Sequence, residues 1–248
     1  MTRHLTPFPL RLARTEGEVA AAQALRHRVF VEELGARGGA LTAEGREADR
    51  FDAHCEHLLL FDALGEGVLI GTTRLMTDDG ARQAGGFATE DEFDIAPLRS
   101  DGRALLEVGR TCLLSGYRGG AAMHRLWQGL ATVVEERGIG LLFGLASFQG
   151  IDPKSVAQPL SCLFRDHLAA ETLRPRSLRP LPVEQSGLDR RAAVLGMPAL
   201  LKAYLRLGAR VGDGACLDPD FGCIDVCMVL ETAQLSARAR AIYGAGSV

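Results

Sequence analysis

The sequence lacks the segments that would place a protein in a membrane or export it. No uninterrupted apolar run approaches the roughly 20 residues that a helix needs to span a bilayer. The first ten residues also lack the apolar stretch of a signal peptide. Net charge is −3, so there is no overall basic signature for nucleic acid. These absences predict a cytoplasmic protein without a nucleic-acid partner, whose membrane contact would be peripheral, at the inner membrane surface.

Common nucleotide and metal motifs are missing as well. Neither GxxxxGK[ST] nor GxGxxG occurs, so nucleotide hydrolysis and dinucleotide binding have no support. The six cysteines form no CxxC pair, and the His, Cys and Glu of residues 54–57 have no second pair at zinc-finger spacing. Cys223 and Cys227 lie in a strand-like run, where four residues span roughly 13 Å. We therefore expect buried thiols in a reducing compartment, no metal and no resident cofactor.

What the sequence does contain is typical of a globular protein. Its 248 residues can bury a large core without disulfides or metals. Hydrophobic residues make up 47% and charged residues 24%, which disfavours disorder and a coiled coil.

Apolar periodicity and turn residues divide the chain into helices and strands. Thr15 begins a capping box for the first helix. The Gly-Glu-Gly turn at 65–67 predicts an antiparallel hairpin. We expect helices at about 16–34, 119–138, 152–167 and 198–207, loops at 38–52 and 78–86, and strands at 9–14, 57–62, 68–76, 104–114, 140–146, 209–216 and 223–230.

These elements predict one mixed α/β domain spanning residues 1–248. The succession of strand, glycine turn, helix and strand over 104–146 is a βαβ unit, so its two strands should be parallel neighbours. Residues 152–200 form an insertion that is partly helical. Within it, residues 174–191 are rich in proline and arginine and predict a surface excursion or lid.

The turn at the start of the long helix is the strongest candidate for a ligand site. It reads Tyr117-Arg118-Gly119-Gly120-Ala121. Glycines let the backbone approach a ligand, and the first helical turn offers free N–H groups to a phosphate. A plain tight turn without a ligand is the alternative, and the two interpretations are about equally supported by the residues alone.

This strand, turn and helix resemble the acyl-donor motif of GNAT acyltransferases, usually Arg/Gln-x-x-Gly-x-Gly/Ala. The resemblance implies a GNAT-like fold with a central, mostly antiparallel mixed sheet flanked by helices. Here the motif is one residue shorter, which favours the phosphopantetheine arm of a carrier protein over coenzyme A. The donor site would use the backbone or side chains of Cys112, Leu113, Arg118, Gly119, Gly120 and Ala121.

The first half of the chain resembles acyl-homoserine lactone synthases. On the first helix, Arg26, Phe30 and Glu33 share a face at helical spacing. The resemblance covers the blocks at residues 25–35, 49–52, 71–75 and 107–110. Those synthases share the GNAT fold and take acyl chains from acyl carrier protein. Ala36 stands where they usually have tryptophan, which disfavours lactone synthesis.

Nearly the whole chain resembles ornithine Nα-acyltransferases, which make lyso-ornithine lipid from 3-hydroxyacyl carrier protein and ornithine. The resemblance lies in the blocks at residues 107–112, 117–120, 146–148, 200–209 and 218–221. It implies acyl carrier protein as donor partner and ornithine as acceptor.

Glu107 and Arg110 are the candidate catalytic residues. An attacking amine must lose a proton, and a carboxylate in an apolar strand can accept it. The alternative is a structural ion pair between the two. Strict strand alternation puts them on opposite faces, although a bulge at Gly109 would change that.

Charged residues elsewhere suit an amino-acid acceptor. Acidic side chains fit the ammonium of ornithine and arginine fits its carboxylate. By the block resemblance, we assign the acceptor and acyl pocket to Arg26, Phe30, Asp49, Asp52 and Arg74, and Asp225 is a further ammonium candidate. Surface ion pairs or loop caps are the usual alternative for such residues.

A run of arginines in the insertion suggests an acidic partner. Arg165, Arg174, Arg176, Arg179, Arg190 and Arg191 would suit an acidic carrier protein or membrane surface, and a solvated face is an equal alternative.

Together these observations predict an N-acyltransferase that moves a (3-hydroxy) fatty acyl group from acyl carrier protein to the α-amino group of ornithine. The residues leave two alternatives open. One is an acyl-homoserine lactone synthase using S-adenosylmethionine, and the other is a non-catalytic acyl-carrier-binding module.

Overall fold

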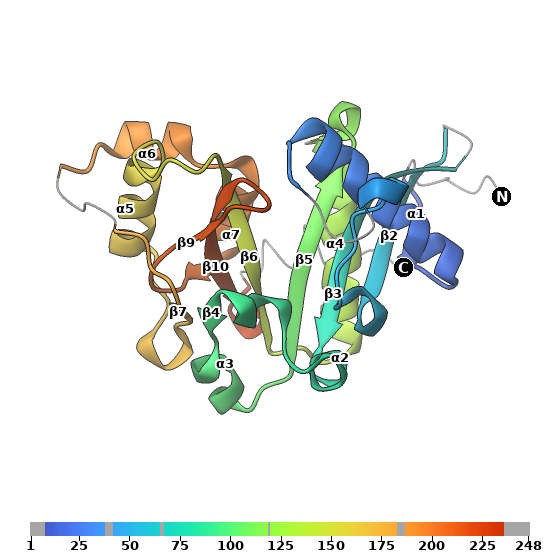
Figure 1. Ribbon diagram of the computed structural model, residues 1–248. Coiled ribbons are helices and arrows are strands. Elements are labelled where there is room, and N and C mark those ends of the chain that lie inside the picture. Colours follow the sequence, from blue (N-terminus) through green and yellow to red (C-terminus); the bar gives the residue numbers. More distant parts are fainter. Residues whose placement is uncertain (1–7, 38–41, 65–66, 119, 183–186, 236–248) are drawn as a thin grey trace. The chain divides into compact units, whose positions relative to one another are not determined.

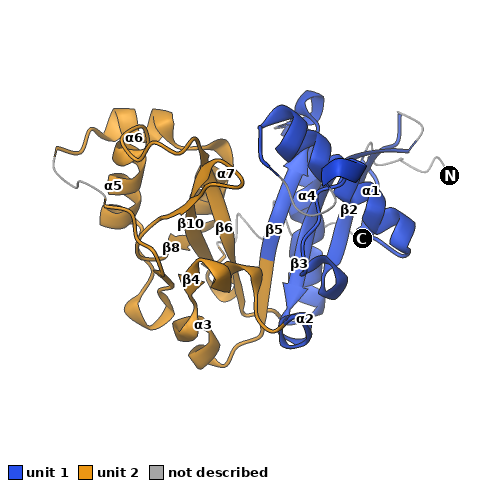
Figure 2. Cartoon of the chain, viewed as in Figure 1, with its two compact units in different colours: residues 1–84, 108–138, 237–248 blue, residues 85–107, 139–236 orange. Residues whose placement is uncertain are grey.

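A computed structural model describes residues 8–37, 42–64, 67–118, 120–182 and 187–235 (Figure 1). The chain forms two compact units (Figure 2). Unit 1 comprises residues 1–84, 108–138 and 237–248, and unit 2 comprises residues 85–107 and 139–236. The boundary falls inside strand β5 (Leu105–Leu113), so this strand contributes to both units. The expectation of a single domain over the whole chain stays a prediction.

Unit 1 is built on antiparallel strands. β1 pairs with β2 and β2 with β3, which confirms the predicted hairpin. Helix α1 packs against β3, and α4 packs against β1 and β2 (Figure 1). The elements of this unit are β1 (Leu10–Leu12), α1 (Glu16–Arg26), β2 (Glu56–Asp62), β3 (Val68–Thr77), α2 (Asp78–Ala84), residues 108–113 of β5 and α4 (Gly120–Glu136), with short 3₁₀ turns at Thr42–Glu44, Asp52–His54 and Ser115–Tyr117.

The first helix begins as expected and then changes its winding. The Thr15 hydroxyl accepts a hydrogen bond from the Glu18 amide at 3.2 Å, which confirms the N-terminal cap. The α-helical part ends at Arg26, and the segment His27–Glu33 is π-helical. Its end is marked by a hydrogen bond from the Leu34 amide to the Val29 carbonyl, five residues back, at 3.1 Å. The helix therefore ends at Glu33, close to the predicted residue 34, but the α-helical winding expected for it was wrong over the seven residues His27–Glu33. Such segments occur often at functional sites.

Helix α2 lies where the sequence predicted a loop. The Asp-Asp-Gly start of the segment is typical of a turn, because glycine is a poor helix former. In the structure, Gly80 lies against the backbone of His54, so closely that a β-carbon built on Gly80 would be 2.3 Å from the His54 carbonyl oxygen. Ala81, next to it, is buried. This tertiary contact outweighs the local preference for a turn.

Unit 2 contains the parallel pair. Residues 105–107 of β5 pair in parallel with residues 141–143 of β6, and β10 runs antiparallel to β6, β8 and β9. This confirms the βαβ unit and the mixed, mostly antiparallel sheet. The elements are a 3₁₀ turn at Ala88–Asp91, β4 (Phe93–Asp94), α3 (Ala96–Asp101), β6 (Leu141–Gln149), α5 (Ala157–Asp166), a 3₁₀ turn at Glu171–Leu173, β7 (Arg176–Ser177), α6 (Arg190–Gly196), α7 (Ala199–Leu207), β8 (Arg210–Val211), β9 (Cys216–Asp218), β10 (Cys223–Glu231) and a 3₁₀ turn at Thr232–Gln234.

Two predicted boundaries in unit 2 were wrong. The helix expected from residue 152 begins at Ala157, because Asp152 closes a turn by accepting hydrogen bonds from the Lys154 and Ser155 amides. The strand expected over residues 209–216 is two strands, β8 and β9. Between them, Gly214 has φ +81°, a left-handed backbone that glycine adopts readily.

The cysteines follow the prediction of unpaired thiols. All six are free; five are buried, and Cys55 is half-buried. Among the residues that the structure describes, no helix is both long and apolar enough to cross a bilayer.

Replacing Gly80 with alanine should destabilise unit 1. The new methyl group would overlap the rigid His54 carbonyl, and overpacking of this kind costs about 1–3 kcal/mol. The measurement is urea unfolding followed by circular dichroism. Gly17→Ala is the matched control, because the nearest atom to its new β-carbon lies 3.8 Å away. Equal stability of the two variants would show that the backbone at Gly80 or His54 shifts to accommodate the methyl group.

Candidate functional site

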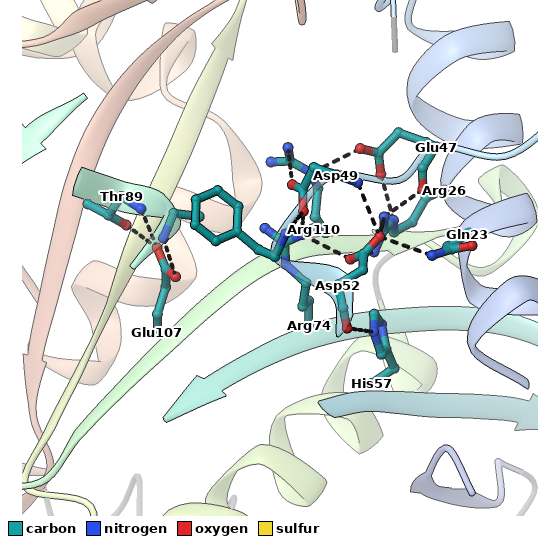
Figure 3. A network of polar contacts seen from close by, with 12 residues as sticks. Gln23, Arg26, Glu47, Asp49, Asp52, His57, Arg74, Thr89, Glu107 and Arg110 are labelled. Atoms are coloured by element: carbon teal, nitrogen blue, oxygen red, sulfur yellow. Dashed lines mark hydrogen bonds and ion pairs between the residues drawn. The ribbon is translucent and has the colours of Figure 1, made fainter. Parts of the chain in front are cut away.

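Unit 1 contains a buried network of charged side chains centred on Arg26 (Figure 3). Arg26 is 0% exposed and comes from the last turn of α1. Its Nε donates to Glu47 Oε2 at 2.6 Å, and its Nη1 and Nη2 donate to the two oxygens of Asp52 at 2.8 and 2.7 Å. Nη2 also donates to the Glu47 carbonyl at 2.5 Å. Every guanidinium nitrogen of Arg26 therefore has a partner within the protein.

Arg74 on β3 extends this network. Its Nη1 donates to Asp49 Oδ1 at 2.6 Å and to Asp52 Oδ1 at 2.9 Å. The side chain is 4% exposed. Asp52 is thus shared by Arg26 and Arg74, which explains how three buried charges are tolerated together.

Arg110 on β5 completes the network. Its Nε donates to Glu47 Oε1 at 3.2 Å, and its Nη2 donates to Asp49 Oδ2 at 3.1 Å. Three arginines and three carboxylates therefore alternate, and their formal charges cancel. Solvent reaches the network mainly at its edge, where the Arg110 and Asp49 side chains are 24% and 22% exposed.

The backbone of Arg110 is unusual. Its φ is +52°, and among the described residues no other non-glycine residue has a positive φ. A left-handed conformation at a residue with a side chain is strained and is enriched at functional sites. The sequence pointed to an irregularity at Gly109, and the structure places it one residue later.

The network holds the carboxylates of Asp49 and Asp52 ionised. Burial alone would raise the pKa of Asp52, but the hydrogen bond and charge of Arg26, followed by those of Arg74, keep that pKa well below its ordinary value of 3.8. Burial likewise opposes the lowered pKa of Asp49, and the charges of Arg74 and Arg110 outweigh it. Because both pKa values are depressed, the stability that these carboxylates contribute is complete above about pH 4 and is lost as the pH falls further.

Neutral polar groups border the network. Gln23 Nε2 donates to Asp52 Oδ2 at 3.1 Å. His57 on β2 is 1% exposed, and burial lowers its pKa, so it is neutral at physiological pH. Its Nδ1 atom is buried and has no hydrogen-bond partner among the described residues.

The structure brings most of the predicted acceptor-pocket residues together. Arg26, Asp49, Asp52 and Arg74 share the network with the predicted catalytic Arg110. Phe30, by contrast, packs against the cluster of Leu25, Val29 and Cys112. The α-helical spacing that grouped Phe30 and Glu33 with Arg26 does not hold in the π-helical segment.

Glu47 is a central residue that the sequence reasoning missed. It is 1% exposed and binds both Arg26 and Arg110. Its surroundings in the sequence are polar and contain glycine, so nothing local distinguishes Glu47 from an exposed loop glutamate. The signal that the sequence offers is charge balance, because three clustered arginines need three carboxylates to neutralise them.

Glu107, in unit 2, is anchored by the 3₁₀ turn at Ala88–Asp91 (Figure 3). Its carboxylate accepts hydrogen bonds from the Ala88 amide at 3.0 Å, the Thr89 amide at 2.6 Å and the Thr89 hydroxyl at 2.5 Å. The residue is 6% exposed. Three donors fix the orientation of this carboxylate, which is what a positioned base requires. Thr89 is a second residue that the sequence reasoning missed.

The predicted donor turn is stabilised by a different set of contacts in unit 1. Arg118 Nε donates to the Leu113 carbonyl at 3.1 Å, and the other two guanidinium nitrogens donate to the Glu33 carboxylate. Gly120 has φ +59° and begins α4, and Ala121, next in the helix, is exposed. Gly119 lies outside the described residues.

Cys112 is suited to a structural role. It is 5% exposed, and burial raises the pKa of its thiol to about 12. A thiol that stays protonated is a poor nucleophile. Any contribution of Cys112 and Leu113 to the donor site would therefore come from their backbone amides.

The arginines of the insertion have several partners of their own in unit 2. Arg190 pairs with Asp166 at 2.8 Å, and Arg176 pairs with Glu171 at 3.5 Å. Arg174 donates to the Ala169 carbonyl at 2.9 Å, and Arg179 contacts Cys216 Sγ at 3.8 Å. Arg165, Arg176 and Arg190 have side chains 58%, 57% and 63% exposed, so they remain accessible to an acidic partner.

An acidic cluster lies elsewhere in unit 2. Ligand-type atoms of Asp218, Cys223 and Asp225 lie within 4.8 Å of one another. Burial, followed by the charge of Asp225, raises the pKa of the Cys223 thiol, so this sulfur is protonated and poorly suited to bind a metal. Burial and the charges of Asp225 and Asp218 also raise the pKa of Glu92 to about 8.

Comparison with known proteins relates the chain to acyltransferases. An acetyltransferase (GNAT) domain model matches residues 25–128. The chain is 45% identical to the L-ornithine N(alpha)-acyltransferase of Rhodobacter capsulatus, over 95% of this chain and 94% of that protein. Three further curated relatives with the same name are each 39% identical over at least 94% of this chain.

Solved structures agree on the fold. FeeM, an N-acyl amino acid synthase from uncultured soil microbes, is 15% identical with a TM-score of 0.58, over 94% of this chain and 97% of that one. The AHL synthase LasI is 16% identical with a TM-score of 0.53, over 97% of each chain. At these identities the likeness shows the fold alone, and it confirms the predicted GNAT-like architecture.

Replacing Asp52 with asparagine should destabilise the protein strongly at neutral pH. The change leaves Arg26 and Arg74 buried with an uncompensated charge, which costs about 3–5 kcal/mol in comparable buried pairs. Denaturant unfolding at pH 7 and at pH 3 measures the effect. The difference between wild type and variant should shrink at pH 3, because the wild type loses the contribution of Asp52 as the pH falls.

Asp79→Asn provides the control. The Asp79 carboxylate pairs with Arg82 on the surface, where both side chains are more than two-thirds exposed, and its loss should cost about 1 kcal/mol or less. A similar loss for the two variants would mean that the network contributes no more than a surface ion pair.

Proposed function

This chain belongs to the L-ornithine N(alpha)-acyltransferase family, and we propose that it transfers a (3-hydroxy) fatty acyl group from acyl carrier protein to the α-amino group of L-ornithine. The observation that carries this proposal is the 45% identity to a relative of that name, over 95% of the chain. The product would be a lyso-ornithine lipid.

The reaction is a direct acyl transfer. The α-amino nitrogen attacks the thioester carbonyl, the C–N bond forms, the C–S bond breaks and the pantetheine sulfur departs. Glu107 accepts the proton of the amine, directly or through a water molecule. Its fixed orientation and low exposure support this role. Positioning of the two substrates supplies most of the remaining acceleration.

The ion network supports a specific division of roles in acceptor binding. Arg26, Asp52 and Arg74 are nearly inaccessible and engaged with one another, so they act by fixing the network. Asp49 and Arg110 form its exposed edge and offer one carboxylate and one guanidinium to an amino acid. An ammonium group fits the first and a carboxylate fits the second.

The donor would bind at the start of α4. Backbone amides at the start of a long helix suit the phosphate of a phosphopantetheine arm, and Arg118 adds a positive charge. Arg165, Arg176 and Arg190 are exposed and suit an acidic carrier protein. A long acyl product also favours peripheral contact with the inner membrane surface.

The deciding experiment offers the purified protein 3-hydroxyacyl carrier protein and a panel of free amino acids, with products identified by mass spectrometry. We expect an N-acyl product with ornithine that exceeds the products formed with lysine or neutral amino acids. Parallel reactions contain acyl-coenzyme A as donor or S-adenosylmethionine as acceptor. Product formed only in one of those parallel reactions would reject this proposal.

A Glu107→Gln variant tests the catalytic role. Without a base, kcat should fall by about 10²- to 10⁴-fold, whereas KM for the donor should change little. Thr89→Val is the matched control, because it removes one hydrogen bond to Glu107 and leaves both backbone donors in place. We expect kcat of this control to stay within about tenfold of wild type. Unchanged turnover in Glu107→Gln would exclude Glu107 as the base.

A further inference from the structure

The guanidinium of Arg118 already holds an anion. Two of its nitrogens donate to the two oxygens of the Glu33 carboxylate, one of them at 2.6 Å, and its Nε donates to the Leu113 carbonyl at 3.1 Å. This side-by-side geometry is the one in which arginine binds carboxylates and phosphates alike. An incoming phosphate on Arg118 would need the same two donors.

Glu33 reaches Arg118 from the π-helical segment. It is the last residue of His27–Glu33 and lies 85 positions before Arg118 in the sequence. The cluster of Leu25, Val29 and Cys112 joins the first helix to β5 nearby in the chain. The anion is therefore supplied by a defined part of unit 1 rather than by a neighbouring residue of the turn.

The ion pair between Arg118 and Glu33 is exposed to solvent, so another anion can replace the Glu33 carboxylate. The side chains of Glu33 and Arg118 are 38% and 40% exposed, so water and solutes reach both. The hydrogen bond and charge of Arg118 lower the pKa of Glu33, which is ionised at neutral pH. Exposed ion pairs of this kind are weak, so an anion with more charge or more acceptor oxygens can replace the carboxylate.

We propose that Glu33 is an internal competitor for the donor's phosphate, and that it must leave Arg118 before the donor binds. This inference rests on the proposed donor site at the start of α4. Glu33 then determines donor affinity, because each binding event replaces a carboxylate on Arg118 by a phosphate. A donor without a phosphate cannot displace Glu33 in this way.

The experiment measures KM for acyl-phosphopantetheine and for acyl-pantetheine, which lacks the phosphate, in wild type and Glu33→Gln. Removing the competitor should lower KM for the phosphorylated donor by about two- to fivefold, the range expected for an exposed ion pair. KM for acyl-pantetheine should stay the same. Glu32→Gln removes the same charge from the adjacent, 62% exposed residue and should change neither value.

A double variant separates this inference from the proposed donor site. In an Arg118→Gln background, adding Glu33→Gln should have no further effect, because the shared partner is gone. If Arg118→Gln alone leaves KM for the phosphorylated donor unchanged, the donor site is wrong. If Arg118→Gln raises KM but Glu33→Gln leaves it unchanged or raises it, the donor site stands and Glu33 is not a competitor.

Discussion

The mutual neutralisation of three arginines and three carboxylates is the constraint on which unit 1 depends. The network joins α1, the segment 47–52, β3 and β5, and no member can be removed without leaving another charge buried. It also holds a stretch of chain with little regular structure. Within it, the Asp49 carboxylate accepts a hydrogen bond from the Phe51 amide at 2.9 Å. The charges of the network thus act together with the buried side chains of Ala48 and Phe51 to fix this loop.

The charged residues in the first half of the chain mostly bind one another. Arginine and aspartate at these positions look like substrate ligands when only the sequence is considered. In the structure most of their hydrogen-bonding capacity is used internally, and only the edge formed by Arg110 and Asp49 is exposed to solvent. Glu107 follows the same pattern in unit 2, where the backbone of Ala88 and Thr89 binds its carboxylate. The candidate site residues of both units are thus held in place by other polar groups of the protein.

Local patterns were sufficient to predict the elements whose stability is local. The βαβ unit and the β2–β3 hairpin follow from apolar periodicity and glycine turns, and both are confirmed. Helix α2 and the π-helical segment were not predictable in this way. The first depends on the contact of Gly80 with His54, and the second on a change of winding that the spacing of apolar residues does not reveal.

The residues of the candidate site likewise divide into those that local sequence patterns reveal and those that they do not. Glu107 stood out because a carboxylate is rare in an apolar strand. Asp49, Asp52 and Arg74 were found only through resemblance to a family. Glu47 and Thr89 were missed, because each acts through a partner 18 or more residues away in the sequence. Pairing between distant charged residues is a property of the folded chain.

The left-handed backbone of Arg110 carries a consequence for protein engineering. Glycine would adopt φ +52° without strain, so a design procedure that minimises backbone strain would select glycine there. The same exchange would delete the side chain that bridges Glu47 and Asp49. The backbone at position 110 would then be less strained, but the carboxylates of Glu47 and Asp49 would lose the arginine that links them at the solvent-exposed edge of the network. Position 110 is therefore one where relief of backbone strain and neutralisation of buried Glu47 select different amino acids.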